Sequence, residues 1–133
     1  MKSKPCLTLD DCRKMAAACE AEAQRNAWNV AIAILDDGGH PLLLLRMDGA
    51  TPSNAENAIQ KGRTAALTRR STKVWEDRIA AGRTSTLSMP VMAVQGGVPL
   101  VYQGECVGGI GVSGVQSPQD EQIALAGAAA LAA

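Results

Sequence analysis

The chain has 133 residues with 13 basic and 13 acidic side chains, so its formal net charge is zero, and 47% of its residues are hydrophobic. This length favours one domain over residues 1–133, and the balanced charge argues against partners such as nucleic acid or an anionic membrane. No stretch approaches the roughly 20 apolar residues of a membrane span, and the polar opening MKSKP lacks the apolar stretch of a signal peptide, so we expect a cytoplasmic protein.

Residues 8–26 predict an amphipathic helix, because apolar residues recur at alternating spacings of three and four. Thr8 and Asp11 form an acidic variant of the capping box at its start. Residues 28–35 predict a strand that is apolar on both alternating sets of positions, and such a strand must be covered on both faces. The short turn at residues 36–39 then predicts an antiparallel hairpin with a second strand over residues 42–46.

The next helix is expected to begin at Ser53 as N-cap, with Glu56 as its capping-box partner. Its small residues form one stripe that lets the helix approach a sheet closely; they are Ala55, Ala58, Ile59, Gly62, Ala65 and Ala66. Glu56 and Lys61 flank this stripe on opposite sides. A shorter helix follows from Ser71 to Gly82, and a polar loop is expected over residues 83–90.

The last third of the chain predicts three short strands, over residues 91–94, 98–102 and 106–113. Ser117, Pro118 and Asp120 then start an alanine-rich helix that is expected to run to the C-terminus. The fold class is therefore α+β: a five-stranded antiparallel sheet with helices on both faces.

Several candidate site residues have both a structural and a functional interpretation. His40 is the single histidine and follows the Gly38-Gly39 turn; it is either a polar residue at a hairpin or a ligand for a metal or haem iron. Arg46 either pairs with a nearby aspartate or holds a carboxylate. Lys61 either extends its ammonium group to solvent or has a lowered pKa in an apolar setting.

The glycine-rich end of the last strand is a second candidate. Three glycines at positions 108, 109 and 111 imply that a helix or a ligand approaches the backbone closely. The adjoining Ser113, Gly114 and the helix start after them could bind a carboxylate or phosphate. The fingerprints GxGxxG, P-loop and GxSxG are absent, and the four cysteines have no CxxC spacing, so nucleotide binding, a catalytic triad and a cysteine metal site are not favoured.

Four blocks of sequence, DDGGHPLLLLRMDGA, AIQKGRTAAL, QGGVPLVYQGECVGGIGVSG and PQDEQIALAG, resemble the GlcG/HbpS-like family, which includes the C-terminal domain of PduO-type proteins. The resemblance extends from about residue 7 to the C-terminus. It implies a profilin-like three-layer α/β/α architecture and assembly into a homo-oligomer, a dimer or larger. It also implies that some members bind haem and that others are encoded in catabolic operons.

By the same resemblance, His40 is the leading candidate for the haem iron, and Arg46, Glu56, Lys61, Ser113 and Asp120 match recurrent polar positions. Any haem would be held non-covalently, because no CxxCH motif is present. We therefore expect a small-ligand-binding protein, with haem or another small metabolite bound through His40, Arg46, Ser113, Gly114 and Asp120.

Two other functions remain open at this point. One is a cofactor-independent isomerase, tautomerase or lyase that acts on a small carboxylate or a keto/enol intermediate. Lys61, Glu56 and Arg46 would be its catalytic residues, with Arg46 and the helix start near Ser117 holding the carboxylate. The other is a partner subunit that stabilises a neighbouring enzyme, for which an exposed apolar patch would be the sign.

Overall fold

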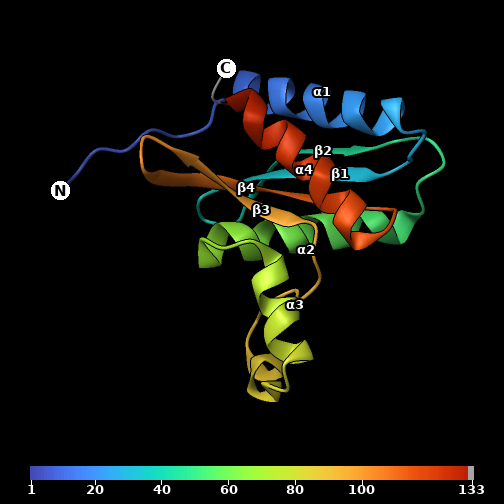
Figure 1. Cartoon of the computed structure of the whole chain (residues 1–133). Coiled ribbons are helices and arrows are strands. Elements are labelled where there is room, and N and C mark those ends of the chain that lie inside the picture. The colour runs from blue at the N-terminus through green and yellow to red at the C-terminus, as the bar shows by residue number, and fades with distance from the viewer. Residues whose placement is uncertain (132–133) are drawn as a thin grey trace.

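The computed structural model describes residues 1–131. Its elements in chain order are α1 (Leu9–Arg25), β1 (Ala31–Asp36), β2 (Pro41–Arg46), α2 (Pro52–Thr68), α3 (Thr72–Ala80), the 3₁₀ helix η1 (Thr84–Ser88), β3 (Gly97–Tyr102), β4 (Glu105–Ser113) and α4 (Ser117–Leu131). The strands form an antiparallel sheet in the order β2-β1-β4-β3. Figure 1 shows α1 and α4 on one face of this sheet and α2 on the other. The α+β class with helices on both faces is confirmed.

The prediction of five strands is wrong, since the described residues contain four. Residues 91–94, which were expected to be a strand, have no regular structure. The hydrogen bonds that backbone N–H groups of this segment and of the next residue donate go to side chains of the helices or to a local turn, not to a neighbouring strand. The N–H of Val91 donates to the carbonyl oxygen of Met89 at 2.9 Å. The N–H of Met92 donates to Thr64 Oγ1 of α2 at 2.9 Å, and that of Gln95 donates to Glu76 Oε1 of α3 at 3.2 Å.

Strand β1 lies in the middle of the layers, and Ala31 to Leu35 are fully buried, as expected for a strand apolar on both sides. Ile32 and Ile34 belong to the larger core beneath α1 and α4. Ala31, Ala33 and Leu35 belong to a smaller core beneath α2. Alternate side chains of β1 therefore fill two separate hydrophobic cores, one on each face of the sheet.

The glycines of β4 are explained by the close approach of α2. A Cβ atom on Gly111 would lie 2.9 Å from the carbonyl carbon of Ala58 and closer still to its oxygen. A Cβ on Gly109 would lie 3.0 Å from the backbone nitrogen of Ala66. Of the two explanations offered by the sequence, helix packing accounts for these two positions, because α2 touches the strand where side chains are missing.

The start of α2 differs from the prediction. Its N-cap is Thr51 and Pro52 occupies the first turn, where a missing N–H costs nothing. Ser53 is inside the helix, and its hydroxyl lies 3.0 Å from Thr51 Oγ1. Glu56 accepts a hydrogen bond from Gln60 Nε2 at 2.8 Å and caps nothing. By contrast, the capping box of Thr8 and Asp11 and the cap by Ser71 are confirmed.

Helix α3 and η1 project from the sandwich on the side of α2, where they form an arm (Figure 1). The base of the arm is fixed to the body, because Thr72 Oγ1 accepts from the N–H of Gly97 at 2.9 Å and Ser71 Oγ donates to Glu121 at 2.9 Å. Trp75 is buried against Arg78, whose guanidinium lies 4.7 Å from the ring centroid. Within residues 1–131, none of the helices has the length and hydropathy of a membrane span.

Candidate functional site

A polar hollow of about 340 Å³ opens where the end of β4, helix α2 and the start of α4 meet. Four residues singled out from the sequence line it together: Lys61, Ser113, Gly114 and Asp120. The other lining residues are Asn54, Asn57, Met92, Val94, Val115 and Ser117. We call this space the polar hollow.

Lys61 and Asp120 form a buried ion pair at the wall of the polar hollow. Lys61 Nζ lies 3.1 Å from Asp120 Oδ2, and only 5% and 3% of the two side chains are exposed. Lys61 Nζ also donates to the carbonyl oxygen of Val112 at 3.1 Å. Because Lys61 belongs to α2, Val112 to β4 and Asp120 to α4, one ammonium group joins all three layers of the fold.

The carboxyl group of Asp120 has a raised pKa, chiefly because burial penalises its charged form. The positive charge of Lys61 opposes this shift, as does the backbone N–H of Val115, which donates to Asp120 Oδ1 at 3.1 Å. While both groups are charged, the ion pair brings no net charge into the hollow. Because its pKa is raised, the Asp120 carboxyl group takes up a proton more readily than an exposed aspartate does.

Two asparagines of the polar hollow were missed by the sequence analysis. Asn54 Oδ1 lies 3.1 Å from the hydroxyl of Ser113, which donates to it, and Asn57 lines the same space. Their spacing to Lys61, seven and four residues, places all three on one side of α2. The helical spacing to Lys61 could have identified both asparagines as site residues. The sequence analysis instead treated this part of the chain as the capping box of Ser53 and Glu56, which the structure does not contain.

Arg46 does not share the polar hollow. In the sheet, Ala31 of β1 pairs with Arg46 on one side and with Ser113 on the other, so two strand spacings, about 10 Å, separate the last two. Arg46 is exposed and lines a different hollow of about 400 Å³ that includes Glu20 and Asp48. Glu56 is also exposed and lines neither space.

His40 lies at the turn between β1 and β2 and is exposed. Its backbone N–H donates to Asp36 Oδ1 at 2.9 Å, as does the N–H of Gly38, so the aspartate side chain holds the turn. The turn rests on α2: Arg63 Nε donates to the carbonyl oxygen of Gly39 at 2.9 Å. The imidazole is therefore available at the surface, on a turn whose backbone is fixed.

An apolar groove of about 460 Å³ runs along α2 between that helix and residues 89–92. Its walls are Gln60, Arg63, Thr64, Leu67, Met89, Pro90, Val91 and Met92. Two residues of its wall, Arg63 and Leu67 of α2, also lie against Gly39 in the turn before His40. Met92 lines both the groove and the polar hollow, so residues 91–94 separate the two spaces.

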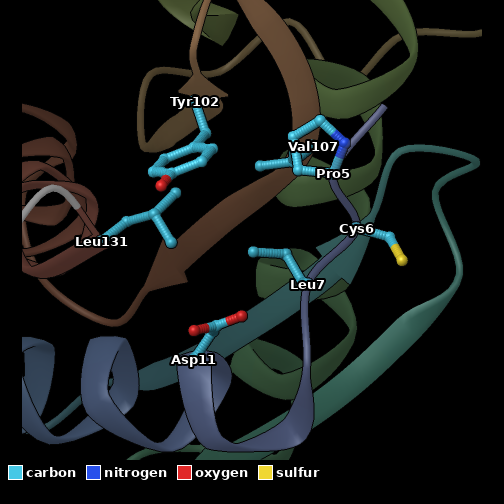
Figure 2. A pocket seen from close by; sticks show the side chains of 7 residues that line it. All are labelled: Pro5, Cys6, Leu7, Asp11, Tyr102, Val107 and Leu131. Carbon is cyan, nitrogen blue, oxygen red and sulfur yellow. The ribbon is translucent and has the colours of Figure 1, made fainter. Parts of the chain in front are cut away.

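A smaller space of about 230 Å³ lies between the N-terminal segment, β3 and the end of α4. Figure 2 shows Leu7, Tyr102 and Leu131 directed toward this space, with the thiol of Cys6 turned away from it. Asp11 at its edge already serves the cap of α1. None of the site residues proposed from the sequence lines this space. Among residues 1–131, no group of three or more His, Cys, Asp or Glu side chains could hold a metal ion.

Comparison with known proteins gives a consistent result. A family model described as "Haem degrading protein HbpS-like" matches residues 7–129. Protein GlcG of Escherichia coli (strain K12) is 46% identical over 114 residues, which are 85% of this chain and 85% of GlcG. The crystal structure of a double mutant of Streptomyces reticuli HbpS superposes with a TM-score of 0.87 at 34% identity, covering 97% of this chain and 89% of HbpS. A crystal structure of a PduOC:haem complex superposes with a TM-score of 0.86 at 29% identity and 95% coverage of both chains.

Proposed function

We propose that this chain, which belongs to the HbpS-like family, is a small-ligand-binding protein that binds haem non-covalently. The observation that carries the proposal is the likeness over 95% of both chains to a PduOC domain crystallised with haem. The family membership and the likeness to HbpS support the same ligand class. Haem bound to this chain would supply an iron centre whose reactivity is set by its axial ligands.

The residues present fit haem best at the apolar groove. Its wall of Leu67, Pro90 and Val91 offers apolar contact to a flat macrocycle, and Arg63 offers a cation for a propionate. Imidazole and thioether groups are both established axial ligands of haem iron. Met89 lines the groove, and His40 follows Gly39, which contacts the wall residues Arg63 and Leu67. We therefore assign the iron-binding role to His40, in agreement with the resemblance.

The other predicted cofactor-binding residues are not beside the groove. Arg46 lines its own hollow, and Ser113, Gly114 and Asp120 line the polar hollow, whose asparagines and buried ion pair suit a small polar metabolite better than a macrocycle. Their roles as binders of a small ligand remain proposals. The enzyme alternative gains no support, because Lys61 and Arg46 line separate spaces and Glu56 lines neither.

A haem titration tests the proposal. Purified protein mixed with haem should give a shifted Soret band that saturates, and His40→Ala should abolish the shift or move it to another wavelength. Met89→Leu should alter the band if its sulfur is the second axial ligand. Glu56→Ala is the matched control, since this exposed helix residue lines no hollow described above. An unshifted spectrum for the unaltered protein would refute haem binding, and an identical spectrum for His40→Ala would refute the role of His40.

We also infer that the chain forms a homo-oligomer through the free edge of β2. The two sheet edges differ: β3 has Pro99 in its interior, where it cannot donate to a further strand, whereas the proline of β2 is its first residue, Pro41, and four leucines follow it. Leu42 and Leu44 on β2 are 39% and 45% exposed. A second copy of β2, paired antiparallel about a two-fold axis, would cover both the edge and these leucines.

Sedimentation measures this directly. The unaltered chain should sediment with at least twice the monomer mass of 13.8 kDa. Leu44→Lys should shift it toward the monomer, whereas Val101→Lys on the opposite edge strand, at a residue 59% exposed, should leave the mass unchanged. A monomeric unaltered chain, or an oligomer that Leu44→Lys does not weaken, would rule out this interface.

Three expectations from the sequence and the resemblance remain proposals: a cytoplasmic location, a place in a catabolic operon, and a single profilin-like GlcG/HbpS-like domain over residues 1–133. The last is supported by the one sheet on which α1, α2 and α4 all pack. Limited proteolysis that releases a stable fragment of either half would contradict a single domain.

A further inference from the structure

We infer that the polar hollow is a second binding site, separate from the apolar groove, for a small carboxylate that carries a hydroxyl or keto oxygen. The inference does not depend on haem binding, because His40 and the groove supply none of the groups used here except the shared wall residue Met92. It rests on the buried ammonium group of Lys61, the hydroxyl and amides around Ser113, and the small size of the hollow.

The buried ammonium group has one unused donor. Lys61 Nζ carries three N–H groups, of which one donates to Val112 O and one to Asp120 Oδ2. Within residues 1–131 the ammonium group makes these two hydrogen bonds and no third. The side chain is 95% buried yet lines the polar hollow, so a ligand in the hollow can supply the third acceptor. A carboxylate oxygen suits an ammonium donor better than a neutral oxygen does.

The charge of the ion pair also fits this ligand. A buried lysine and aspartate together are neutral and, without further partners, cost more to bury than apolar residues of the same size. Because burial already raises the pKa of Asp120, an incoming carboxylate can share the ammonium group of Lys61 while Asp120 takes up a proton. The pair can therefore accept one anionic group without leaving two uncompensated negative charges.

A second set of polar groups faces the hollow from the side of α2 and the end of β4. The hydrogen bond from Ser113 Oγ to Asn54 Oδ1 leaves the NH₂ group of Asn54 and the lone pairs of the hydroxyl available. The amide of Asn57 lines the same wall. These donors and acceptors match a hydroxyl or keto oxygen next to the carboxylate. Met92, Val94 and Val115 contribute apolar contact for a short carbon skeleton.

Calorimetric titration of the haem-free protein with four three-carbon probes tests the inference. Lactate and pyruvate carry both the carboxylate and the second oxygen, propionate lacks the second oxygen, and propane-1,2-diol lacks the carboxylate. We expect lactate or pyruvate to bind at millimolar concentration or below, propionate to bind about tenfold more weakly, and the diol not to bind. Failure of both lactate and pyruvate to bind would overturn the inference, as would equal binding of the diol.

Two mild variants locate the site. Ser113→Ala and Asn57→Ala should each weaken binding of the preferred probe about tenfold while leaving propionate nearly unchanged, since a lost hydrogen bond of about 1.4 kcal/mol corresponds to that factor. Lys61→Met should abolish binding of every carboxylate, but it also removes a buried charge, so its folding must be confirmed by circular dichroism. Asp48→Asn is the control, because Asp48 lines the separate hollow of Arg46.

The haem and carboxylate proposals fail independently. Ser113→Ala should give the same Soret titration as the unaltered protein, because Ser113 does not line the apolar groove. Loss of haem binding with lactate binding intact would refute only the haem proposal. Unchanged probe binding in both Ser113→Ala and Asn57→Ala would show that the carboxylate binds elsewhere and would overturn the inference.

Discussion

Replacing Gly111 by alanine tests the contact between β4 and α2 on which the arrangement of the layers depends. The new Cβ would lie 2.9 Å from the carbonyl carbon of Ala58 and closer to its oxygen, and both are backbone atoms of a helix that cannot rotate away. Overpacking of this kind costs about 1–3 kcal/mol, and we expect the upper end because no side chain can yield. With a urea slope of about 2 kcal/mol per molar, a loss of about 3 kcal/mol lowers the unfolding midpoint by about 1.5 M.

The matched control is Gly104→Ala in the turn between β3 and β4. Gly104 has a φ of +77°, and no atom lies within 4 Å of a Cβ built on it, so alanine there is strained by its backbone conformation alone. That strain costs about 1 kcal/mol, which lowers the midpoint by about 0.5 M. Urea unfolding followed by circular dichroism measures both variants. If Gly111→Ala is no less stable than Gly104→Ala, the close approach of α2 does not limit this position.

Three further predictions concern charge and reactivity. Hydrogen bonds from Thr8 at the start of α1 lower the pKa of Asp11. The contribution of Asp11 to stability is therefore present above its ordinary pKa of 3.8 and is lost as the pH falls through the lower pKa of the folded state. At pH 7 Asp11→Asn should be less stable than the unaltered protein, and the urea unfolding curves of the two proteins should converge well below pH 3.8. Burial raises the pKa of Cys19 to about 12, so iodoacetamide at pH 8 should modify the exposed Cys6 and spare Cys19 until urea is added. Mass spectrometry measures the two alkylation rates, and equal rates for Cys6 and Cys19 in the folded protein would refute this prediction. Lys61→Met should lower the free energy of unfolding by about 3–5 kcal/mol, because it leaves the Asp120 carboxylate buried without its partner. The double variant Lys61→Met with Asp120→Leu should recover most of that loss. If the losses of the two single variants simply add in urea unfolding, the two side chains are not a coupled pair.

The elements that could be predicted from sequence are those whose signal lies in their own consecutive residues. The amphipathic period of α1, its capping box and the apolar composition of β1 are signals of this kind, and each element is found where it was expected, although β1 pairs with the distant β4. Residues 91–94 have the composition of a strand, but the N–H of Met92 donates to Thr64 and that of the following Gln95 to Glu76, and both acceptors are distant in sequence. A local sequence pattern cannot show that distant side chains accept the hydrogen bonds a strand would need, and the prediction of a fifth strand was wrong for that reason.

The candidate site shows the same division. Lys61, Ser113 and Asp120 were each predicted as site residues, and all three line the polar hollow at the end of β4. Arg46 was expected with them because it ends a strand, but the sequence does not fix the strand order, and β1 lies between Arg46 and Ser113. Nor could the sequence indicate that the turn before His40 would contact the wall of an apolar groove, because residues 89–92, from another part of the chain, form the other wall of that groove.

The arm formed by α3 and η1 has a practical consequence for work on this protein. Its base is anchored to the sheet, but its tip touches little except α3, and Gly82 at the tip has open space around it. Chain segments of this kind tolerate inserted peptides, because the added residues extend into solvent without displacing a core. A fluorophore or an affinity epitope engineered between α3 and η1 would therefore report on the protein while leaving the polar hollow and the β2 edge undisturbed.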